Sequence, residues 1–558
     1  MVTEPTRSEP TVAAAAAEIL RSEGVTHLPA YPLNPLIEAA AGLGIRPVIV
    51  RQERVGVHMA DAISRLGDTV GVTCMQSGPG VENAFGAVAQ AYAEGVPLVV
   101  IPGGAPRAET WVPPAFNAAL NFRHVTKATE QVTTGAGLVP ALRRAFAQAR
   151  NGRPGPVLVE IPADVWDEAA PGLETYTPSR RARSAPDTGS VEAAARALVE
   201  ADRPLLYAGQ GVHRATAWRQ LRELAELLEA PVTTSIEGKS AFPETHPLAL
   251  GSGGVAMPRA VFEHVRDADV VFGVGASFSA TPFGIRFPTA GTSFIHNTAD
   301  PGDLDKNIPA EHALLGDTAL ALDLLLEAVA DRLGRPRGRA EEVAARIRAQ
   351  NGPWLEKWRP LLTSTATPLS PYRVIWDLLH TVDVERTTIT HDAGSPRDEL
   401  TPFWRSVAPH SYLGWGKSTQ LGYGLGLAMG AKLAQPERLC INVWGDAAIG
   451  MTGMDLETCA RAGIPVLSIL FNNSAMAMED RIMATSRERF ASTDITGEYA
   501  EMARAFGLHA ERVATPAEIV PAIRKAVAAT EDGTPALLEF VTTREKTYST
   551  FDYATYQG

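Results

Sequence analysis

The fold is decided by two neighbouring stretches, Val443-Trp-Gly-Asp-Ala-Ala-Ile-Gly-Met-Thr-Gly-Met-Asp-Leu-Glu457 and Ile469-Leu-Phe-Asn-Asn-Ser-Ala475. In the first stretch an apolar strand ends at Gly445-Asp446, and the pattern predicts a helix that begins near Thr452–Asp455. In the second stretch another apolar strand ends at Asn472-Asn473. This alternation of strand, short turn and helix is typical of α/β domains with parallel sheets, whose strands end side by side at one edge.

That shared edge would bring Asp446 and Asn473 together as two hard oxygen ligands. Mg²⁺ takes such ligands and fills its remaining positions with water or with phosphate oxygens. The helix after Asp446 would offer main-chain N–H groups and a favourable dipole to the same phosphates. The alternative for this motif alone is two ordinary strand ends with turn residues.

The same alternation continues along the whole chain, with buried strands predicted over 97–102, 156–162 and 270–274. Two segments look like linkers: 170–190 is rich in Pro, Ser, Thr and Arg, and 333–370 holds a charged helical stretch followed by three prolines. The sequence therefore predicts three α/β domains, each a doubly wound parallel sheet, over 1–175, 190–335 and 368–545. Residues 546–558 would form a C-terminal tail.

Composition excludes several classes of protein. The chain has 558 residues, of which 45% are hydrophobic and 20% charged, which fits a globular protein. Its net charge of −12 argues against a nucleic-acid partner. Three widely spaced cysteines, Cys74, Cys440 and Cys459, predict neither a disulfide framework nor a cysteine-based zinc site. Since no signal-peptide pattern and no long apolar run is present, we expect a cytoplasmic protein without a membrane span.

The pair of strand ends resembles the motif of thiamine-diphosphate (ThDP) dependent enzymes, in which Gly-Asp-Gly is followed further along by Asn-Asn. Here 27 residues separate Asp446 from Asn473, and Ala447 stands where the family usually has glycine. The resemblance implies that Mg²⁺ is bound by Asp446, the side chain of Asn473 and the main-chain carbonyl of Ala475. It also implies that Gly445 and Ala447 contact the cofactor.

The N-terminal block resembles the same family. Arg51-Gln-Glu53 is similar to the motif of the activating glutamate, with Gln52 in place of the common histidine. This implies that the Glu53 carboxyl group hydrogen-bonds the aminopyrimidine ring and promotes loss of the thiazolium proton, while the cofactor does the chemistry. Ser77-Gly-Pro-Gly80 followed by Asn83 is similar to a family turn, and this implies a pyrimidine contact for Asn83.

Two further stretches of the C-terminal block resemble cofactor contacts. Gly416-Lys-Ser-Thr-Gln-Leu421 is similar to the segment that bends the cofactor, which implies an apolar wedge at Leu421 and a carbonyl contact at Thr419. Asp392-Ala-Gly-Ser-Pro396 replaces the usual Asp-x-Gly-Gln-His. Ser395 is then the candidate donor to the diphosphate, whereas Pro396 has no N–H to offer.

The substrate end is less clear. Acetolactate-synthase-like enzymes, to which the likeness is strongest, usually carry Phe-Gln where this chain has Phe116-Asn117, so Asn117 is a candidate catalytic residue with a shorter reach. Glu479 takes the place of a glutamate used by 2-oxo acid decarboxylases and is a candidate general acid/base. The alternative is that Glu479 is an exposed helix residue. The middle block keeps only part of the motifs of flavin-binding members, and supports neither FAD nor ADP.

The predicted function is a ThDP- and Mg²⁺-dependent enzyme that makes or breaks a C–C bond beside a carbonyl. Acetolactate-synthase-like decarboxylation of a 2-oxo acid, with transfer of the acyl carbanion to an acceptor, is the first expectation. A non-ligating 2-oxo acid decarboxylase is the second, and a 2-hydroxyacyl-CoA lyase or oxalyl-CoA-type decarboxylase acting on an acyl-CoA is the third. The resemblance also implies a homodimer or homotetramer with active sites between subunits.

Two alternatives belong to other classes of protein. A non-catalytic relative should lack Glu53 or a metal ligand, and this chain has both. A nucleotide-binding oxidoreductase should show G-x-G-x-x-G after a strand, with a partner acid about 20 residues further on. Gly422-Tyr-Gly-Leu-Gly-Leu-Ala428 resembles that pattern only loosely.

Overall fold

The computed structural model describes residues 9–67, 69–480 and 482–552. By its internal contacts the chain forms two compact units. The first unit holds the chain up to Ala182 together with Leu425–Pro436 and Met454–Ile464, and the second holds the remainder. Residues 553–558 of the predicted tail, and the first eight residues of the predicted first domain, lie outside the described part.

The first unit contains one six-stranded parallel sheet with the strand order β2-β1-β3-β4-β6-β5. Its strands are β1 (His27–Ala30), β2 (Arg46–Ile49), β3 (Gly71–Met75), β4 (Leu98–Gly104), β5 (Ala128–Gln131) and β6 (Pro156–Pro162). Every residue of β3, β4 and β6 is buried, as expected for parallel strands that are covered on both faces.

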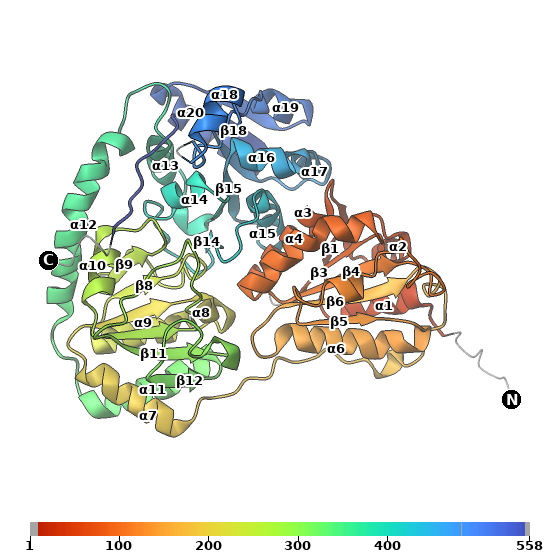
Figure 1. Ribbon diagram of the computed structural model, residues 1–558, viewed down its shortest axis with the longest axis horizontal. Coiled ribbons are helices and arrows are strands. Elements are labelled where there is room, and N and C mark those ends of the chain that lie inside the picture. The colour runs from red at the N-terminus through yellow and green to blue at the C-terminus, as the bar shows by residue number, and fades with distance from the viewer. Residues whose placement is uncertain (1–8, 68, 481, 553–558) are drawn as a thin grey trace. The chain divides into compact units, whose positions relative to one another are not determined.

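Helices cover both faces of this sheet (Figure 1). One face carries α3 (Glu53–Leu66) and α4 (Pro79–Glu94), and the other carries α1 (Val12–Ser22), α2 (Asn34–Gly42) and α6 (Leu138–Arg150). The short helix α5 (Ala118–Asn121) precedes β5. Most of α15 (Tyr423–Ala434) and the whole of α17 (Leu456–Arg461) also belong to this unit. A Cβ atom at Gly426 would overlap His58, and one at Gly430 would overlap the Met59 carbonyl, so glycine lets α15 approach α3 closely.

The second unit contains two more six-stranded parallel sheets, ordered β12-β11-β10-β7-β8-β9 and β14-β13-β15-β16-β18-β17. The first of them consists of β7 (Pro204–Ala208), β8 (Val232–Thr234), β9 (Ala249–Ser252), β10 (Val270–Val274), β11 (Ser293–Thr298) and β12 (His312–Leu315). The second consists of β13 (Thr387–His391), β14 (Tyr412–Leu413), β15 (Leu439–Gly445), β16 (Leu467–Asn472), β17 (His509–Val513) and β18 (Ala536–Val541).

Helices cover these two sheets as well. On the middle sheet, α7 (Thr188–Glu200), α9 (Trp218–Leu228) and α11 (Thr318–Leu333) share one core, while α10 (Arg259–Asp267) packs with α12 (Ala340–Leu362). The short α8 (Gln210–Arg214) follows β7. On the last sheet, α13 (Pro371–Leu379) and α20 (Pro516–Glu531) share a core with the end of α12. Four shorter helices complete it: α14 (Ser395–Leu400), α16 (Asp446–Thr452), α18 (Ala484–Phe490) and α19 (Tyr499–Ala505).

The α/β class and the parallel sheets are confirmed. Each sheet lies within one predicted domain range, while the precise domain boundaries stay predictions. The helix expected to begin near Thr452–Asp455 corresponds to α17, which begins at Leu456, whereas α16, which begins at Asp446 directly after β15, was not predicted. The segment 333–370 is also more ordered than a linker, since α12 runs through both Pro353 and Pro360. Proline costs a helix a hydrogen bond, but here Trp354 stacks on Phe403 at 5.1 Å and compensates through packing.

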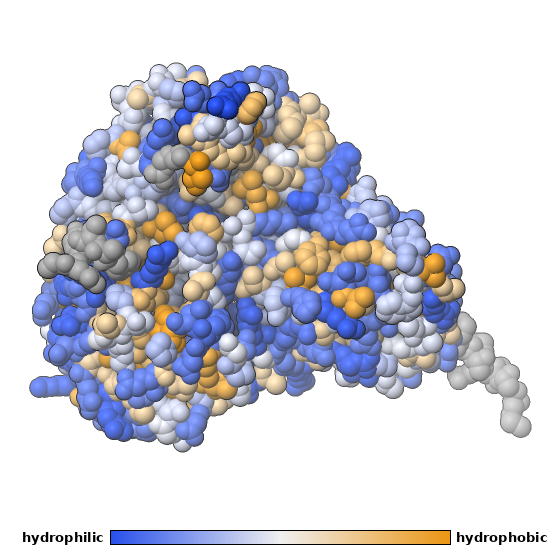
Figure 2. Space-filling view, in the orientation of Figure 1, coloured by the Kyte–Doolittle hydropathy of each residue, from blue (hydrophilic) through white to orange (hydrophobic). Residues whose placement is uncertain are grey.

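Within the described residues, no helix combines the length and the apolar character that a membrane crossing requires. Figure 2 shows apolar residues as separate small patches among mostly hydrophilic ones on the face in view. The most exposed large apolar side chains are Trp111 in the first unit, and Ile482 and Phe490 in the second, at 74%, 79% and 79%. The three cysteines are all buried and none forms a disulfide.

Candidate functional site

The ends of β15 and β16 lie side by side in the last sheet, with Gly445 paired to Phe471. Asp446 begins α16 and Asn473 follows β16. Oδ2 of Asp446 and Oδ1 of Asn473 both accept the main-chain N–H of Ala475, at 3.2 and 3.0 Å. Two oxygens that share one donor are close enough to share one cation, since each keeps a further lone pair. The structure thus brings the predicted pair together, while its role as a Mg²⁺ site stays a prediction.

Asp446 is 3% exposed, and its Oδ1 accepts the Ala447 N–H at 2.9 Å. Burial raises the pKa of the Asp446 carboxyl group above its ordinary value, although main-chain N–H groups, Ala475 first, act in the opposite direction. A bound cation would favour the ionised form. Over the part of the chain that the structure describes, no three His, Cys, Asp or Glu side chains cluster as metal ligands. A carboxylate, an amide and main-chain carbonyls form a set of oxygens that suits Mg²⁺.

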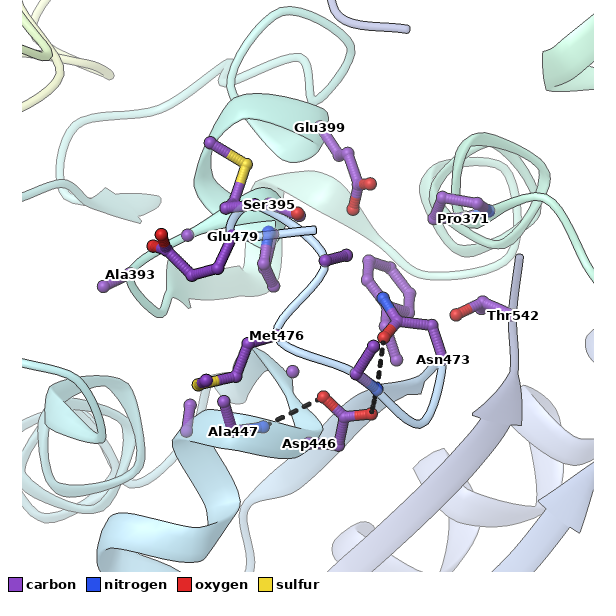
Figure 3. A pocket seen from close by; sticks show the side chains of 18 of the residues that line it. Pro371, Ala393, Ser395, Glu399, Asp446, Ala447, Asn473, Met476, Glu479 and Thr542 are labelled. Atoms are coloured by element: carbon purple, nitrogen blue, oxygen red, sulfur yellow. Dashed lines mark hydrogen bonds between the residues drawn. The ribbon is translucent and has the colours of Figure 1, made fainter. Parts of the chain in front are cut away.

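These residues line a pocket of about 150 Å³ in the second unit (Figure 3). Figure 3 shows Asp446 and Asn473 on one side of the pocket and Ser395 and Glu399 across from them. Glu479 lines the pocket but is exposed, and it lies in a turn before α18, not on a helix. Other lining residues are Leu421, Gly445, Ala447, Ala475, Met476 and Met478.

Leu421 is held at the pocket by the buried carboxylate of Asp392. Asp392 accepts the N–H groups of Gly422 at 2.9 Å and Gly424 at 3.0 Å, and so anchors the start of α15 directly after Leu421. Burial raises the pKa of Asp392 to about 6, although these main-chain donors oppose the shift. Thr419 is half-buried two residues before Leu421, and its carbonyl contact stays a prediction.

Two features across the pocket were not predicted. The Ser395 hydroxyl lies 2.9 Å from the Tyr548 hydroxyl, so the C-terminal segment reaches the candidate diphosphate donor. Glu399 is only 2% exposed, and burial first, then repulsion by Glu545 and Asp398, raises its pKa well above the usual range. Glu399 belongs to the charged run 397–399, a pattern that normally indicates an exposed helix face.

Glu53 is the first residue of α3 in the first unit and is 7% exposed. Asn83, on α4, donates its Nδ2 to Oε2 of Glu53 at 2.6 Å. Arg54 donates its Nη2 to Oδ1 of Asn83 at 3.0 Å. A Cβ atom at Gly80 would lie 2.7 Å from Gln76 and 3.3 Å from Oε1 of Glu53, so glycine gives this carboxyl group its space. The structure therefore pairs Asn83 with Glu53, and its contact to a pyrimidine stays a prediction.

The main chain before Glu53 is held by Asp455, a residue that the sequence reasoning missed. Its Oδ1 accepts the Arg51 N–H at 2.7 Å, and the Arg51 side chain forms an ion pair with Glu457 at 2.7 Å. Asp455 is fully buried. Burial raises its pKa to about 6, although the Arg51 N–H opposes the shift. No local pattern could reveal this contact, because 404 residues separate its partners.

Asn117 is the N-cap of α5. Its Oδ1 accepts the Leu120 N–H at 2.8 Å, and its side chain is buried. The Glu160 carboxylate accepts the next two N–H groups of the same turn, from Ala118 and Ala119. The observed role of Asn117 is therefore to hold a loop, and a catalytic role stays a prediction.

The middle sheet brings the ends of β7 and β10 into close backbone contact. Gly209 donates its N–H to Val274 at 2.9 Å and Gly211 donates to Gly275 at 2.8 Å. The Phe278 ring lies where a Cβ atom of Gly273 would stand, and it contacts His296 edge-on at 4.9 Å. These contacts favour neither FAD nor ADP.

Three family models match this chain in order. They describe the N-terminal thiamine pyrophosphate (TPP) binding domain of thiamine pyrophosphate enzymes over 10–131, their central domain over 191–325, and their C-terminal TPP binding domain over 392–540. Thiamine pyrophosphate is another name for ThDP. The matched ranges fall on the three sheets and include Glu53, Asn83, Asp446 and Asn473.

The chain is also similar to curated proteins over most of its length. The acetolactate synthase large subunit of Parasynechococcus marenigrum is 32% identical, covering 94% of this chain and 86% of that protein. The probable acetolactate synthase large subunit of Methanocaldococcus jannaschii is 29% identical, covering 95% and 91%. The acetolactate synthase isozyme 3 large subunit of Escherichia coli is 28% identical, covering 91% and 90%.

Proposed function

This chain belongs to the family of thiamine-diphosphate-dependent enzymes, and on that premise we propose that it decarboxylates a 2-oxo acid and transfers the acyl group to an acceptor carbonyl. The observation that carries the proposal is the Asp446–Asn473 pair, whose oxygens converge on one N–H at the wall of a pocket. The relatives named acetolactate synthase, which match over most of their length, support the ligating reaction as the first choice.

The residues of the pocket fit the cofactor. Asp446, Asn473 and the Ala475 carbonyl would hold Mg²⁺, and Ser395 would donate to the diphosphate. Leu421 would give the pocket an apolar wall against the cofactor. When bound, ThDP supplies a nucleophilic carbon that attacks the carbonyl of the substrate.

Glu53 would hold a proton against the aminopyrimidine ring, and Asn83 fixes the Oε2 atom that Glu53 presents. Because the other Glu53 oxygen lies beside Gly80, a larger residue at position 80 would displace it. We also propose a homo-oligomer in which Glu53 of one subunit and the Asp446–Asn473 pair of another share an active site. Family membership supports this assembly.

A non-ligating 2-oxo acid decarboxylase is the second candidate. Glu479 favours it, because an exposed carboxyl group at the pocket could protonate the product carbon and release an aldehyde. The two reactions share the decarboxylation step and differ only in what takes up the acyl group.

Two measurements test the proposal. Titration of the cofactor-free protein with ThDP and Mg²⁺ should stabilise it by about 2.7 kcal/mol at a hundredfold excess over Kd. Mass spectrometry of products from single and paired 2-oxo acids, and from acyl-CoAs, should then detect a 2-hydroxy ketone or a 2-hydroxy-2-acyl acid. Aldehyde alone would favour the second candidate, and cleavage of acyl-CoA would favour a lyase. If the titration shows no stabilisation and no product is detected, ThDP dependence is refuted.

A further inference from the structure

We propose that Arg544 is a positioning residue, which sets the metal-binding main chain at 473–475 and the segment that carries Glu479. Arg544 lies three residues after the end of β18, and its side chain is half-buried. Neither the sequence motifs nor the family resemblance assigned it a role. The inference rests on the proposed function, because it concerns how this chain holds Mg²⁺ and its pocket.

The guanidinium group of Arg544 contacts the backbone of the metal-binding residues directly. Its Nε donates to the Asn473 carbonyl at 3.3 Å, and its Nη2 donates to the Ser474 carbonyl at 3.0 Å. A planar fork that spans two consecutive carbonyls fixes the orientation of the peptide groups between them. That orientation places the Ala475 N–H, which bonds both Asp446 and Asn473.

The backbone needs such support at this point. Ser474 has a φ of +56°, in the left-handed region that residues with a side chain rarely adopt. Conformations of this kind persist only when the surroundings hold them. Asn472 provides one contact by accepting the Ser474 N–H at 3.1 Å, and the Ser474 carbonyl accepts from both Arg544, at 3.0 Å, and the Ile495 N–H, at 3.1 Å.

Arg544 also reaches both ends of the segment that walls the pocket. Its Nη1 lies 3.5 Å from Asp480, the residue after Glu479, and its Nη2 lies 3.2 Å from Asp494. Main-chain hydrogen bonds join the same two ends, from Ile495 to Ser474 and from Met476 to Thr493. One side chain thus links the end of β16, the turn that carries Glu479 and the segment near Asp494, which forms an isolated bridge with Ala475.

Burial and charge argue that this is more than a surface ion pair, which typically contributes little. Asp480 is 4% exposed and also accepts the Thr493 hydroxyl at 2.8 Å. Arg487 forms a second ion pair with Asp480 at 3.3 Å, and within the described residues it forms no hydrogen bond to the carbonyls of Asn473 or Ser474. Arg487 therefore serves as a control: it shares the Asp480 carboxylate and differs from Arg544 in the two carbonyl contacts and in the ion pair with Asp494.

The test compares Arg544→Gln, Arg544→Lys and Arg487→Gln with the wild-type protein. Mg²⁺ affinity is measured by titration at saturating ThDP with tryptophan fluorescence or thermal shift as the readout, and each cofactor-free variant is also melted. Loss of an outer contact that orients metal ligands typically weakens binding about 10–100-fold, and we expect that range for Arg544→Gln. Arg544→Lys keeps the charge but not the fork, and should fall between Arg544→Gln and wild type. Arg487→Gln should stay within about twofold of wild type, since the contacts of Arg544 with Asp480 and with both carbonyls remain.

The outcomes separate this inference from the proposed function. Wild-type protein that binds neither ThDP nor Mg²⁺ would overturn both. Wild-type binding with unchanged Mg²⁺ affinity in Arg544→Gln, or with equal losses in Arg544→Gln and Arg487→Gln, would overturn only the role of Arg544. If Arg544→Gln fails to fold, the Mg²⁺ affinity of Arg544→Lys is the test. Full wild-type affinity in that variant would show that a positive charge alone suffices for Mg²⁺ binding, and would overturn the role of the planar fork.

Discussion

Asn83 donates its side-chain amide to Oε2 of Glu53 across 2.6 Å, and Arg54 donates to the oxygen of the same amide at 3.0 Å. Arg54 can only donate hydrogen bonds, so the amide oxygen must face it and the NH₂ group must face the carboxylate. The orientation of Asn83, and through it the rotamer of Glu53, is thus set by the contact of Arg54 with the amide oxygen. Since the partners lie on α3 and α4, the packing of these helices positions Glu53.

Replacing Arg54 by Met should slow exchange of the ThDP C2 proton about 3–10-fold, the equivalent of one hydrogen bond. Without Arg54 the Asn83 amide can rotate and present its oxygen to Glu53. ThDP affinity should stay within about twofold, because Arg54 only orients Asn83. Exchange is read by NMR after acid quench. Arg51→Met is the control, since it removes a nearby guanidinium but leaves the main-chain N–H that binds Asp455. Equal exchange rates in Arg54→Met and wild type would contradict this account.

Glu53→Gln should keep the fold and bind ThDP but lose at least about 100-fold in C2-proton exchange, within the usual range for loss of a proton-transfer group. The side-chain oxygen of the substituted amide can still accept from Asn83, so the change removes the carboxyl proton and little else. Circular dichroism checks the fold and titration checks the cofactor. Exchange near the wild-type rate would exclude the assigned role.

Glu479→Gln should impair protonation or release of the product more than decarboxylation, because its carboxyl group lines the pocket in the turn before α18. Carbon dioxide release and product formation are followed separately in single-turnover experiments. Glu488→Gln, on the exposed face of α18, is the control and should leave both rates unchanged. An unaltered rate of product formation in Glu479→Gln would reduce Glu479 to a surface residue.

Stability should depend on pH through Asp455. Burial raises the pKa of this group from 3.8 to about 6, so the folded protein binds its proton more tightly than the unfolded chain. The stabilisation is full below the unfolded pKa and is lost as pH rises through the folded pKa. Between pH 4 and 7 the free energy of unfolding of wild type should fall by about 2.4 kcal/mol relative to Asp455→Asn.

Urea unfolding of both proteins at pH 4, 5, 6 and 7 measures this difference. Asp392, whose pKa burial also raises to about 6, is present in both proteins and cancels in the comparison. A difference that stays constant across the four pH values would mean that Asp455 does not titrate in the folded state.

Features written into contiguous sequence were predictable here. Asp446 and Asn473 end two apolar strands, so parallel pairing alone brings them to one edge. Glu53 could be placed at the start of a helix because the apolar residues that follow it have helical spacing, which is a local pattern. The course of α12 was not predictable from its prolines, since the stacking of Trp354 on Phe403 depends on where two distant segments meet.

Residues that support the site from a distance could not be found in the sequence. The carboxylate of Asp455 and the guanidinium of Arg544 bind backbone groups. Because nearly every residue offers the same backbone groups, the sequence at the bound position does not reveal the contact. Glu399 differs from the expectation for another reason: a charged run is normally solvated, whereas residues 396–400 of α14 are all buried. Tertiary context overrides the local pattern at each of these positions.

The contact between Arg51 and Asp455 also orders events during synthesis. Strands β1 to β6 are complete once Pro162 has been translated. Asp455, which binds the main chain before α3, follows about 290 residues later. At about 5–20 residues per second, the ribosome needs about 15–60 s to reach it. The first sheet can therefore form early while the backbone before Glu53 stays unfastened, so that a truncated or stalled chain ending before position 455 would carry the glutamate without its anchor.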